Sequence, residues 1–315
     1  MNVLEVLAGV LARPDVWAGT LRFATPLTLA ALGGVISERS GVVNIAMEGM
    51  MLVGAFFAVL AAAATNNIVL ATLVSVGFGG LIAAVHGVVS IQFRANQIVS
   101  GMAINLLALG LTSYLLFHFY SLSGTPPDIP GLPDVTLPLI SSIPFVGEVI
   151  GTRNIVTWLA IIAVPVTWWF LFRTRIGLRI RAVGEHPRAA DTLGVNVYQM
   201  RYLCVILSGL LSGLGGAYLA LGVAHSFSDN MTSGAGFIAL AAMIFGKWHP
   251  VGAFLACLLF GFGASLGINL QGSGTGIPDQ LISATPYILT VIALAGLVGR
   301  ATPPAADGVP YEVGE

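Results

Sequence analysis

Long apolar runs separated by short polar segments constrain this chain more than any other feature. A helix needs roughly 20 apolar residues to cross a bilayer. Runs near that length occur at residues 20–36, 42–64, 68–91, 97–120, 154–172, 201–224, 250–270 and 280–299. Only 9% of the 315 residues are charged, against about 25% in a typical soluble domain. We therefore predict an all-α, polytopic membrane helix bundle.

One further apolar run, residues 235–246, is too short for an ordinary crossing and predicts a half-helix or a re-entrant segment. We expect about 8–10 spans in all, some of them broken or re-entrant. The domain division that follows is an N-terminal segment (1–19) that could lie in the membrane interface, a transmembrane domain (20–300) and a C-terminal tail (301–315).

The segment 173–201 is the most informative polar part of the chain. It carries six of the thirteen basic residues and only two acidic ones. Because an excess of arginine marks cytoplasmic loops, we expect this segment inside the cell. The loop 121–152 has acidic residues and no basic residue. We expect that loop outside the cell.

The centre of the basic segment, GEHPRAADTLG (184–194), predicts a short helix. Pro187 suits the first helical position and Gly194 suits the C-terminal cap. The small residues Ala189 and Ala190 would leave a shallow, exposed face that another protein could grip. We interpret the segment as a docking element on the inner face of the membrane.

A second informative region is SERSGVVNIAMEGM (37–50), a polar break between apolar runs. Asn44 and Glu48 are four residues apart, a spacing that would place them on one helix face. A charged side chain in a bilayer costs roughly 2.5–3.5 kcal/mol on insertion scales, so Glu48 should face the bundle interior or a wet cavity. It could border a solute passage or be a hydrogen-bond anchor for a broken helix. With Asn105 and Phe227, these two residues form our candidate solute path.

The sequence offers no catalytic or metal-binding motif in a suitable structural context. The only Gly-Lys pair, at 246–247, is preceded by Ala241 where a phosphate-binding loop requires glycine. HExxH and CxxC do not occur, and the two cysteines lie far apart in apolar runs. The GxSxG match GASLG (263–267) lies inside the apolar run 250–270, without the strand–turn–helix context of a catalytic serine. We therefore expect no enzyme activity, no catalytic residue, no metal site and no bound cofactor. A net charge of −1 without a basic tail gives no reason to expect nucleic-acid binding.

Three stretches carry a resemblance to a known family: LRFATPLTLAALGGVISERSGVVNIAMEGMMLVGAF (21–56), RTRIGLRIRAVGEHPRAADTLGVNV (173–197) and LSGLLSGLGGAYLAL (207–221). Together they resemble the permease subunits of bacterial ABC importers, in the branch that carries nucleosides and simple sugars. The resemblance covers about residues 20–300. It implies a multi-pass protein of the bacterial inner membrane, in contact with membrane lipid.

The resemblance also implies partners. A cytoplasmic ABC ATPase would bind and hydrolyse ATP, a second, non-identical permease would complete the passage, and an extracytoplasmic solute-binding protein would deliver the solute. Residues 185–194 would couple the ATPase to the permease. The residues assigned to this coupling are Glu185, His186, Pro187, Arg188, Ala189, Ala190, Asp191 and Gly194.

The alternative is an ion-coupled secondary transporter or a channel for small polar solutes. The basic cytoplasmic segment with its compact helix argues against that alternative, as does the shortage of intramembrane carboxylates beyond Glu48.

Overall fold

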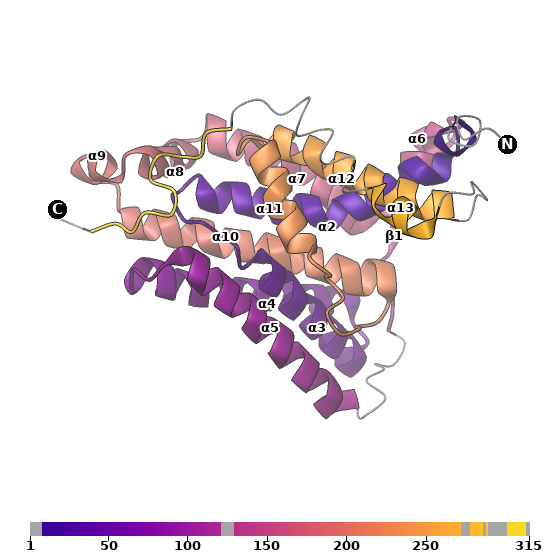
Figure 1. The fold of residues 1–315 in the computed structure, drawn as a ribbon, viewed down its shortest axis with the longest axis horizontal. Helices are drawn as coiled ribbons and strands as arrows, with labels where there is room; N and C mark the ends of the chain where they lie inside the picture. The colour runs from indigo at the N-terminus through magenta and orange to yellow at the C-terminus, as the bar shows by residue number, and fades with distance from the viewer. Residues whose placement is uncertain (1–7, 121–128, 272–277, 286–287, 289–300, 313–315) are drawn as a thin grey trace.

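The computed structural model describes residues 8–120, 129–271, 278–285, 288 and 301–312, and its architecture is almost entirely helical (Figure 1). The prediction of an all-α membrane bundle is confirmed. The long helices are α2 (Pro14–Glu38), α3 (Met47–Thr65), α4 (Ile68–Gly87), α5 (Gln97–Tyr120), α7 (Ile155–Arg173), α10 (Val197–Ala217) and α12 (Pro250–Gln271). Turns of π-helix, η1 (Val88–Gln92) and η3 (Tyr218–Ala224), extend α4 and α10.

Seven helices among the described residues are long and apolar enough to cross a membrane. The run expected to be too short for a crossing forms α11 (Ala235–Phe245), a helix of 11 residues. The expected last span, 280–299, lies largely outside the described residues, which in this run are α13 (Asp279–Ser283) and residues 284, 285 and 288.

Helix α2 lies at the centre of the bundle. It packs against α7, α10, α11 and α12, and most of its side chains from Thr20 to Glu38 are buried. It begins at Pro14, ahead of the expected residue 20, because proline is well suited to the first helical turn. It ends at Glu38, and Gly41 then turns the chain with a positive φ of 87°.

Helices α4 and α10 approach each other through small residues. A Cβ atom on Gly79 would lie 2.4 Å from the carbonyl oxygen of Gly209 and 2.7 Å from the Cα of Gly213. The Ser75 hydroxyl of α4 shares its one proton between the carbonyls of Gly213 on α10 (2.8 Å) and Gly54 on α3 (2.7 Å). Since lipid gives no hydrophobic drive for helix association, this close backbone packing holds the pair together.

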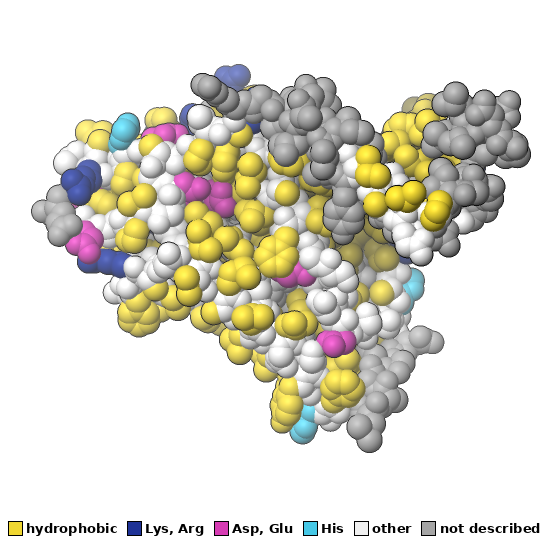
Figure 2. Space-filling model, viewed as in Figure 1, with side chains coloured by type: hydrophobic (Ala, Val, Ile, Leu, Met, Phe, Trp, Pro, Cys, Tyr) yellow, Lys and Arg dark blue, Asp and Glu magenta, His cyan; other side chains and the backbone are white. Residues whose placement is uncertain are grey.

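The two ends of the bundle differ in composition. One end carries α8 (Arg175–Glu185), α9 (Pro187–Thr192) and residues 301–312, and most of the Lys and Arg side chains visible in Figure 2 lie toward it. The other end carries α6 (Pro138–Ser141), η2 (Gly147–Gly151) and an antiparallel pair of strands, β1 (Asp134–Thr136) and β2 (Thr152–Asn154). The arginine excess identifies the first as the cytoplasmic end and the second as the outer end.

Candidate coupling face and solute pockets

The cytoplasmic segment folds into two short helices whose ends are set by local sequence. The Thr174 hydroxyl accepts a hydrogen bond from the amide of Gly177 (3.0 Å) and caps α8. Pro187 occupies the first turn of α9, and Gly194 follows that helix with a φ of 80°. The helix expected over 187–194 is therefore confirmed for residues 187–192.

The exposed face of α9 differs from the expected one. Ala190 is only 3% exposed and packs against Val183 and Val197, so the expectation that it is exposed is wrong. Ala189 is exposed, and Leu193, four residues further on, is 84% exposed. We had not singled out Leu193, although an apolar residue in a polar segment, next to the capping glycine, is an available signal.

The assigned coupling residues divide into two groups. His186 and Arg188 are exposed and Pro187 is half-buried, so they belong to the outer surface of the segment. The two acidic residues are engaged by the C-terminal tail. A Glu185 oxygen accepts a hydrogen bond from the amide of Ala305 (3.2 Å), and an Asp191 oxygen accepts one from the Tyr311 hydroxyl (2.8 Å).

The segment assigned to coupling rests directly on the break between α2 and α3. A Cβ atom on Gly184 would lie 2.2 Å from the carbonyl oxygen of Arg39, so glycine is required for this contact. The Arg39 guanidinium donates a hydrogen bond to the carbonyl of Trp248 (2.9 Å), and burial lowers its pKa. The Trp248 indole donates in turn to a Glu38 oxygen (2.5 Å). A displacement of α8 would therefore also move the residues at the end of α2.

Glu48 lies in the first turn of α3, is 7% exposed, and holds the start of α11. Its carboxylate accepts hydrogen bonds from the Thr232 hydroxyl (2.6 Å) and from the amides of Gly234 (2.8 Å) and Gly236 (2.6 Å). A Cβ atom on Gly236 would lie 2.4 Å from the Glu48 amide nitrogen. The carboxylate thus satisfies amides at a helix start that have no partner within the helix.

The expectation that Asn44 shares a helix face with Glu48 is wrong. Helix α3 begins only at Met47, and residues 42–44 are not helical. The Asn44 side chain accepts a hydrogen bond from the amide of Ala46 (3.1 Å) and donates one to the Ser208 hydroxyl (2.7 Å). An Asn side chain bonded to its own local backbone competes with helix formation.

Asn105, on α5, also contacts this break. Its side-chain oxygen accepts a hydrogen bond from the amide of Gly49 (2.8 Å), and its nitrogen donates to the carbonyl of Ile45 (2.9 Å). Three of the four candidate path residues are therefore gathered around the first turn of α3. Each makes hydrogen bonds to other residues of the chain there.

Phe227, the fourth candidate, packs in the hydrophobic interior. It is 2% exposed and meets Phe56 edge to face, with ring centroids 5.2 Å apart. It lines neither of the two cavities described below.

The inner pocket is a cavity of about 580 Å³ beside the loop that Glu48 holds. Thr232 and Ser233 give it two hydroxyl groups, and its remaining walls are apolar and aromatic. It is lined by Phe23, Pro26, Leu27, Leu219, Met231, Thr232, Ser233, Ala235, Phe237, Ile238, Ala241, Phe260 and Ala264. This volume lies within the range of small-molecule sites. The Gly-rich start of a short apolar helix, TSGAG (232–236), was the available signal for it.

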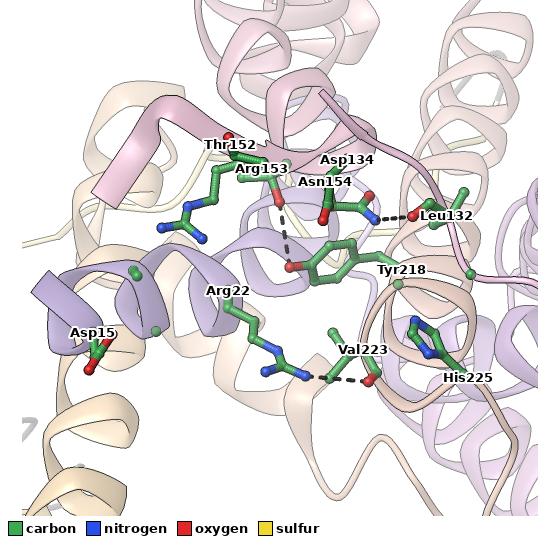
Figure 3. Close-up of a pocket in the computed structure, with 15 residues that line it drawn as sticks. Asp15, Arg22, Leu132, Asp134, Thr152, Arg153, Asn154, Tyr218, Val223 and His225 are labelled. Carbon is green, nitrogen blue, oxygen red and sulfur yellow. Dashed lines mark hydrogen bonds between the residues drawn. The ribbon is translucent and has the colours of Figure 1, made fainter. Parts of the chain in front are cut away.

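The outer pocket, of about 510 Å³, is polar (Figure 3). Arg22 and Arg153 come from α2 and β2, on opposite sides of the Tyr218 ring, and Arg22 donates a hydrogen bond to the carbonyl of Val223 (3.3 Å). Burial lowers the pKa of Arg153. Other polar lining residues are Asp15, Asp134, Thr152, Asn154, Thr157 and His225. The sequence analysis does not predict this pocket. Its available signal is that Arg22 and Arg153 lie at the outer end, where the positive-inside rule leads us to expect few basic residues.

Comparison with known proteins gives the family. Residues 17–295 match the family described as "Branched-chain amino acid transport system / permease component". The guanosine ABC transporter permease protein NupQ of Bacillus subtilis is 44% identical, with all of both chains covered. The nucleoside ABC transporter permease protein NupC of Lactococcus lactis is 42% identical, with 99% of both chains covered. The putative glucose ABC transporter permease protein TsgC13 of Haloferax volcanii is 37% identical, over 89% of this chain and 91% of its own.

Two further relatives are more distant. NupP of Bacillus subtilis is a guanosine ABC transporter permease that is 26% identical, over 89% of this chain and 81% of its own. NupB of Lactococcus lactis is a nucleoside ABC transporter permease that is 24% identical, over 91% of this chain and 81% of its own. With seven apolar helices and this match over most of its length, the chain belongs to the family of branched-chain amino acid transport system permease components and is a multi-pass protein of the bacterial inner membrane.

Proposed function

We propose that the chain is the permease of an ABC importer for nucleosides. The observation that carries this proposal is its match to a guanosine and a nucleoside permease at 44% and 42% identity over full length. A simple sugar is the second candidate, because a putative glucose permease is 37% identical. An ion-coupled transporter is not favoured, since these relatives belong to ABC systems.

ATP is bound and hydrolysed by a separate cytoplasmic subunit in this proposal. That subunit docks on the exposed side of α9, formed by His186, Arg188, Ala189 and Leu193. An exposed leucine between polar residues fits a shallow groove on a partner. Because α8 touches the end of α2 through Gly184, movement of the docked segment reaches the bundle directly.

The inner pocket is the proposed place on this subunit where the solute passes. Its aromatic walls can stack against a nucleobase. The Thr232 and Ser233 hydroxyls donate to Glu48 and to the Asn230 carbonyl, so their oxygens can accept hydrogen bonds from the polar edge of the base. Glu48 is then a positioning residue, because it fixes the loop that carries both hydroxyls. The polar outer pocket gives a hydrogen-bonding solute a first site on the outer side.

Two further partners belong to the proposal. A second, non-identical permease is supported by the pairs NupQ with NupP and NupC with NupB, in which two dissimilar permeases occur in one organism. A solute-binding protein outside the cell would deliver the nucleoside.

Reconstitution of the complete transporter in proteoliposomes tests the solute. ATP-dependent uptake of radiolabelled guanosine, with no uptake of glucose, is the expected result. Uptake of glucose alone would move the protein to the sugar branch, and uptake without ATP would overturn the ABC assignment.

The docking site has a matched pair of substitutions. Leu193→Asp should abolish co-purification of the ATPase, because it places a charge in the apolar centre of the contact. Leu139→Asp is the control, since Leu139 is equally exposed (87%) but lies on α6 at the outer end. Equal ATPase recovery from the two variants would refute docking at α9.

A further inference from the structure

Residues 301–312, which we call the C-terminal strap, lie against the cytoplasmic end of the bundle (Figure 1). The strap contains no helix or strand, yet its residues make hydrogen bonds with several different elements. A terminal segment without secondary structure is expected to be poorly ordered unless specific contacts hold it. Here two groups of contacts hold it, one at Tyr311 and one at residues 305–309.

Tyr311, near the C-terminal end of the strap, is bound to α9. The Tyr311 hydroxyl donates a hydrogen bond to Asp191. The Tyr311 side chain is only 6% exposed and packs with Val183, Ala190 and Val197 beneath α9. Its ring meets that of Tyr198 edge to face at 5.8 Å, and the Tyr198 hydroxyl donates to the Tyr311 carbonyl (3.2 Å). Hydrogen bonds to a charged acceptor are stronger than neutral ones, so this end is firmly held.

The middle of the strap, residues 306–309, is bound to the break between α2 and α3 and to the neighbouring helices α8 and α10. The Gly308 amide donates to the carbonyl of Gly41 (3.3 Å), and the Ala306 amide donates to that of Gly184 (2.9 Å). The buried Arg201 donates to the carbonyl of Val309 (2.9 Å). The Asp307 carboxyl faces that of Glu38, the last residue of α2.

These two attachments give α9 a second connection to the α2–α3 break, beside the one that runs through α8 and Gly184. The short α9 contacts α8 and α10, whereas the strap runs from α9 to the end of α2. From there the break leads into α3, whose Glu48 holds the loop of the inner pocket. A path of direct contacts therefore connects the coupling helix with the pocket.

We propose that the strap is a mechanical link that transmits movement of α9 to the α2–α3 break, with Tyr311 and Asp307 as its positioning residues. The proposal rests on the proposed function of α9 as the docking site. It differs from a purely structural role of the strap, which would affect yield but not the number of ATP molecules hydrolysed for each solute imported.

Tyr311→Phe tests the link, because it removes only the hydroxyl that bonds to Asp191. In the reconstituted transporter we expect normal ATPase recovery and basal hydrolysis, with about a ten-fold loss of uptake, the equivalent of one hydrogen bond to a carboxylate. The ATP consumed for each solute should rise accordingly. Tyr114→Phe is the matched control, since Tyr114 is 65% exposed on α5.

A double-mutant cycle assigns the effect to this bond. Asp191→Ala should reduce uptake in the wild-type background but add little to Tyr311→Phe. Unchanged uptake and an unchanged ATP ratio in Tyr311→Phe would overturn the link, as would loss of the ATPase, which would make the strap part of the docking surface. The proposal that the ATPase docks on α9 is tested separately: it is wrong if Leu193→Asp leaves co-purification of the ATPase unchanged.

Discussion

Two buried glutamates stand on either side of the same helix break, and their surroundings are opposite. Glu48, at the start of α3, is surrounded by three hydrogen-bond donors. Glu38, at the end of α2, accepts hydrogen bonds from the Trp248 indole and the Asn44 backbone, and it also faces a second carboxyl, Asp307. A buried carboxylate whose hydrogen bonds are all made is held in one position. Two carboxyl groups that face each other are stable side by side only when a proton lies between them. The first site is suited to rigidity and the second to change.

The largest effect should follow removal of the Glu48 carboxylate. Glu48→Leu leaves a buried hydroxyl and two buried amides without partners, and each such group costs about 1–3 kcal/mol. We expect folded yield in detergent to fall at least ten-fold, as measured by size-exclusion chromatography. Glu148→Leu is the control, because Glu148 is exposed at the outer end. Equal yields of the two variants would contradict an anchoring role.

Glutamine at each of the two positions sharpens the comparison. Glu48→Gln presents an NH₂ group to donors and should lower thermal stability by about 1–3 kcal/mol, the cost of an unmade buried hydrogen bond. Glu38→Gln can donate to Asp307 while still accepting from Trp248, so its stability should be unchanged or higher. Melting temperatures of the purified variants decide this. A shift of the same sign in both would erase the distinction.

The pH dependence of strap docking is a smaller effect. Burial raises the pKa of Asp307 from 3.8 to about 7, although the nearby Arg201 acts in the opposite direction. A docked acid with a raised pKa holds a proton that the undocked strap releases, so docking is favoured at low pH. Docking should weaken as pH rises from about 4 to about 7, the interval between these two pKa values.

A spin label on Val309→Cys, which is 52% exposed in the wild type, reports this docking through its mobility. Mobility should increase with pH in the otherwise native protein and stay constant after Asp307→Asn. If the asparagine variant showed the same pH response, another group would be responsible.

The smallest expected effect is at the turn between the two glutamates. Ser208→Ala removes one hydrogen bond from the Asn44 amide group, which should cost about 1 kcal/mol. A reduction of a few degrees in melting temperature, with normal uptake, is the expected outcome. A large loss of uptake with full stability would instead place Asn44 in the solute route.

Local signals explain what could be predicted from the sequence. The apolar runs, the Arg-rich segment and the ends of α9 depend on neighbouring residues, so Pro187 and Gly194 were sufficient to predict that helix. The start of α3 could not be predicted in this way. There Gly41, with its positive φ, and the local hydrogen bond of Asn44 overrode the four-residue spacing to Glu48.

Contacts between distant segments carried no such signal. The partners of Glu48 lie on the loop before α11, and those of Asp191 and Arg201 lie on the strap. Ala190 was expected to be exposed because nothing nearby in the sequence announces Tyr311 as its neighbour. Pockets are likewise formed by side chains from several elements, and only packing brings those together.

The strap also has a consequence for the order in which the protein is made. Tyr311 is synthesised 120 residues after Asp191, the residue that it holds. At about 5–20 residues per second, translation needs roughly 6–24 s to cover that separation. During this interval α10, α11 and α12 are synthesised, while α9 still lacks its contact with the strap. A nascent permease therefore cannot connect α9 to the α2–α3 break through the strap until residue 311 has been translated.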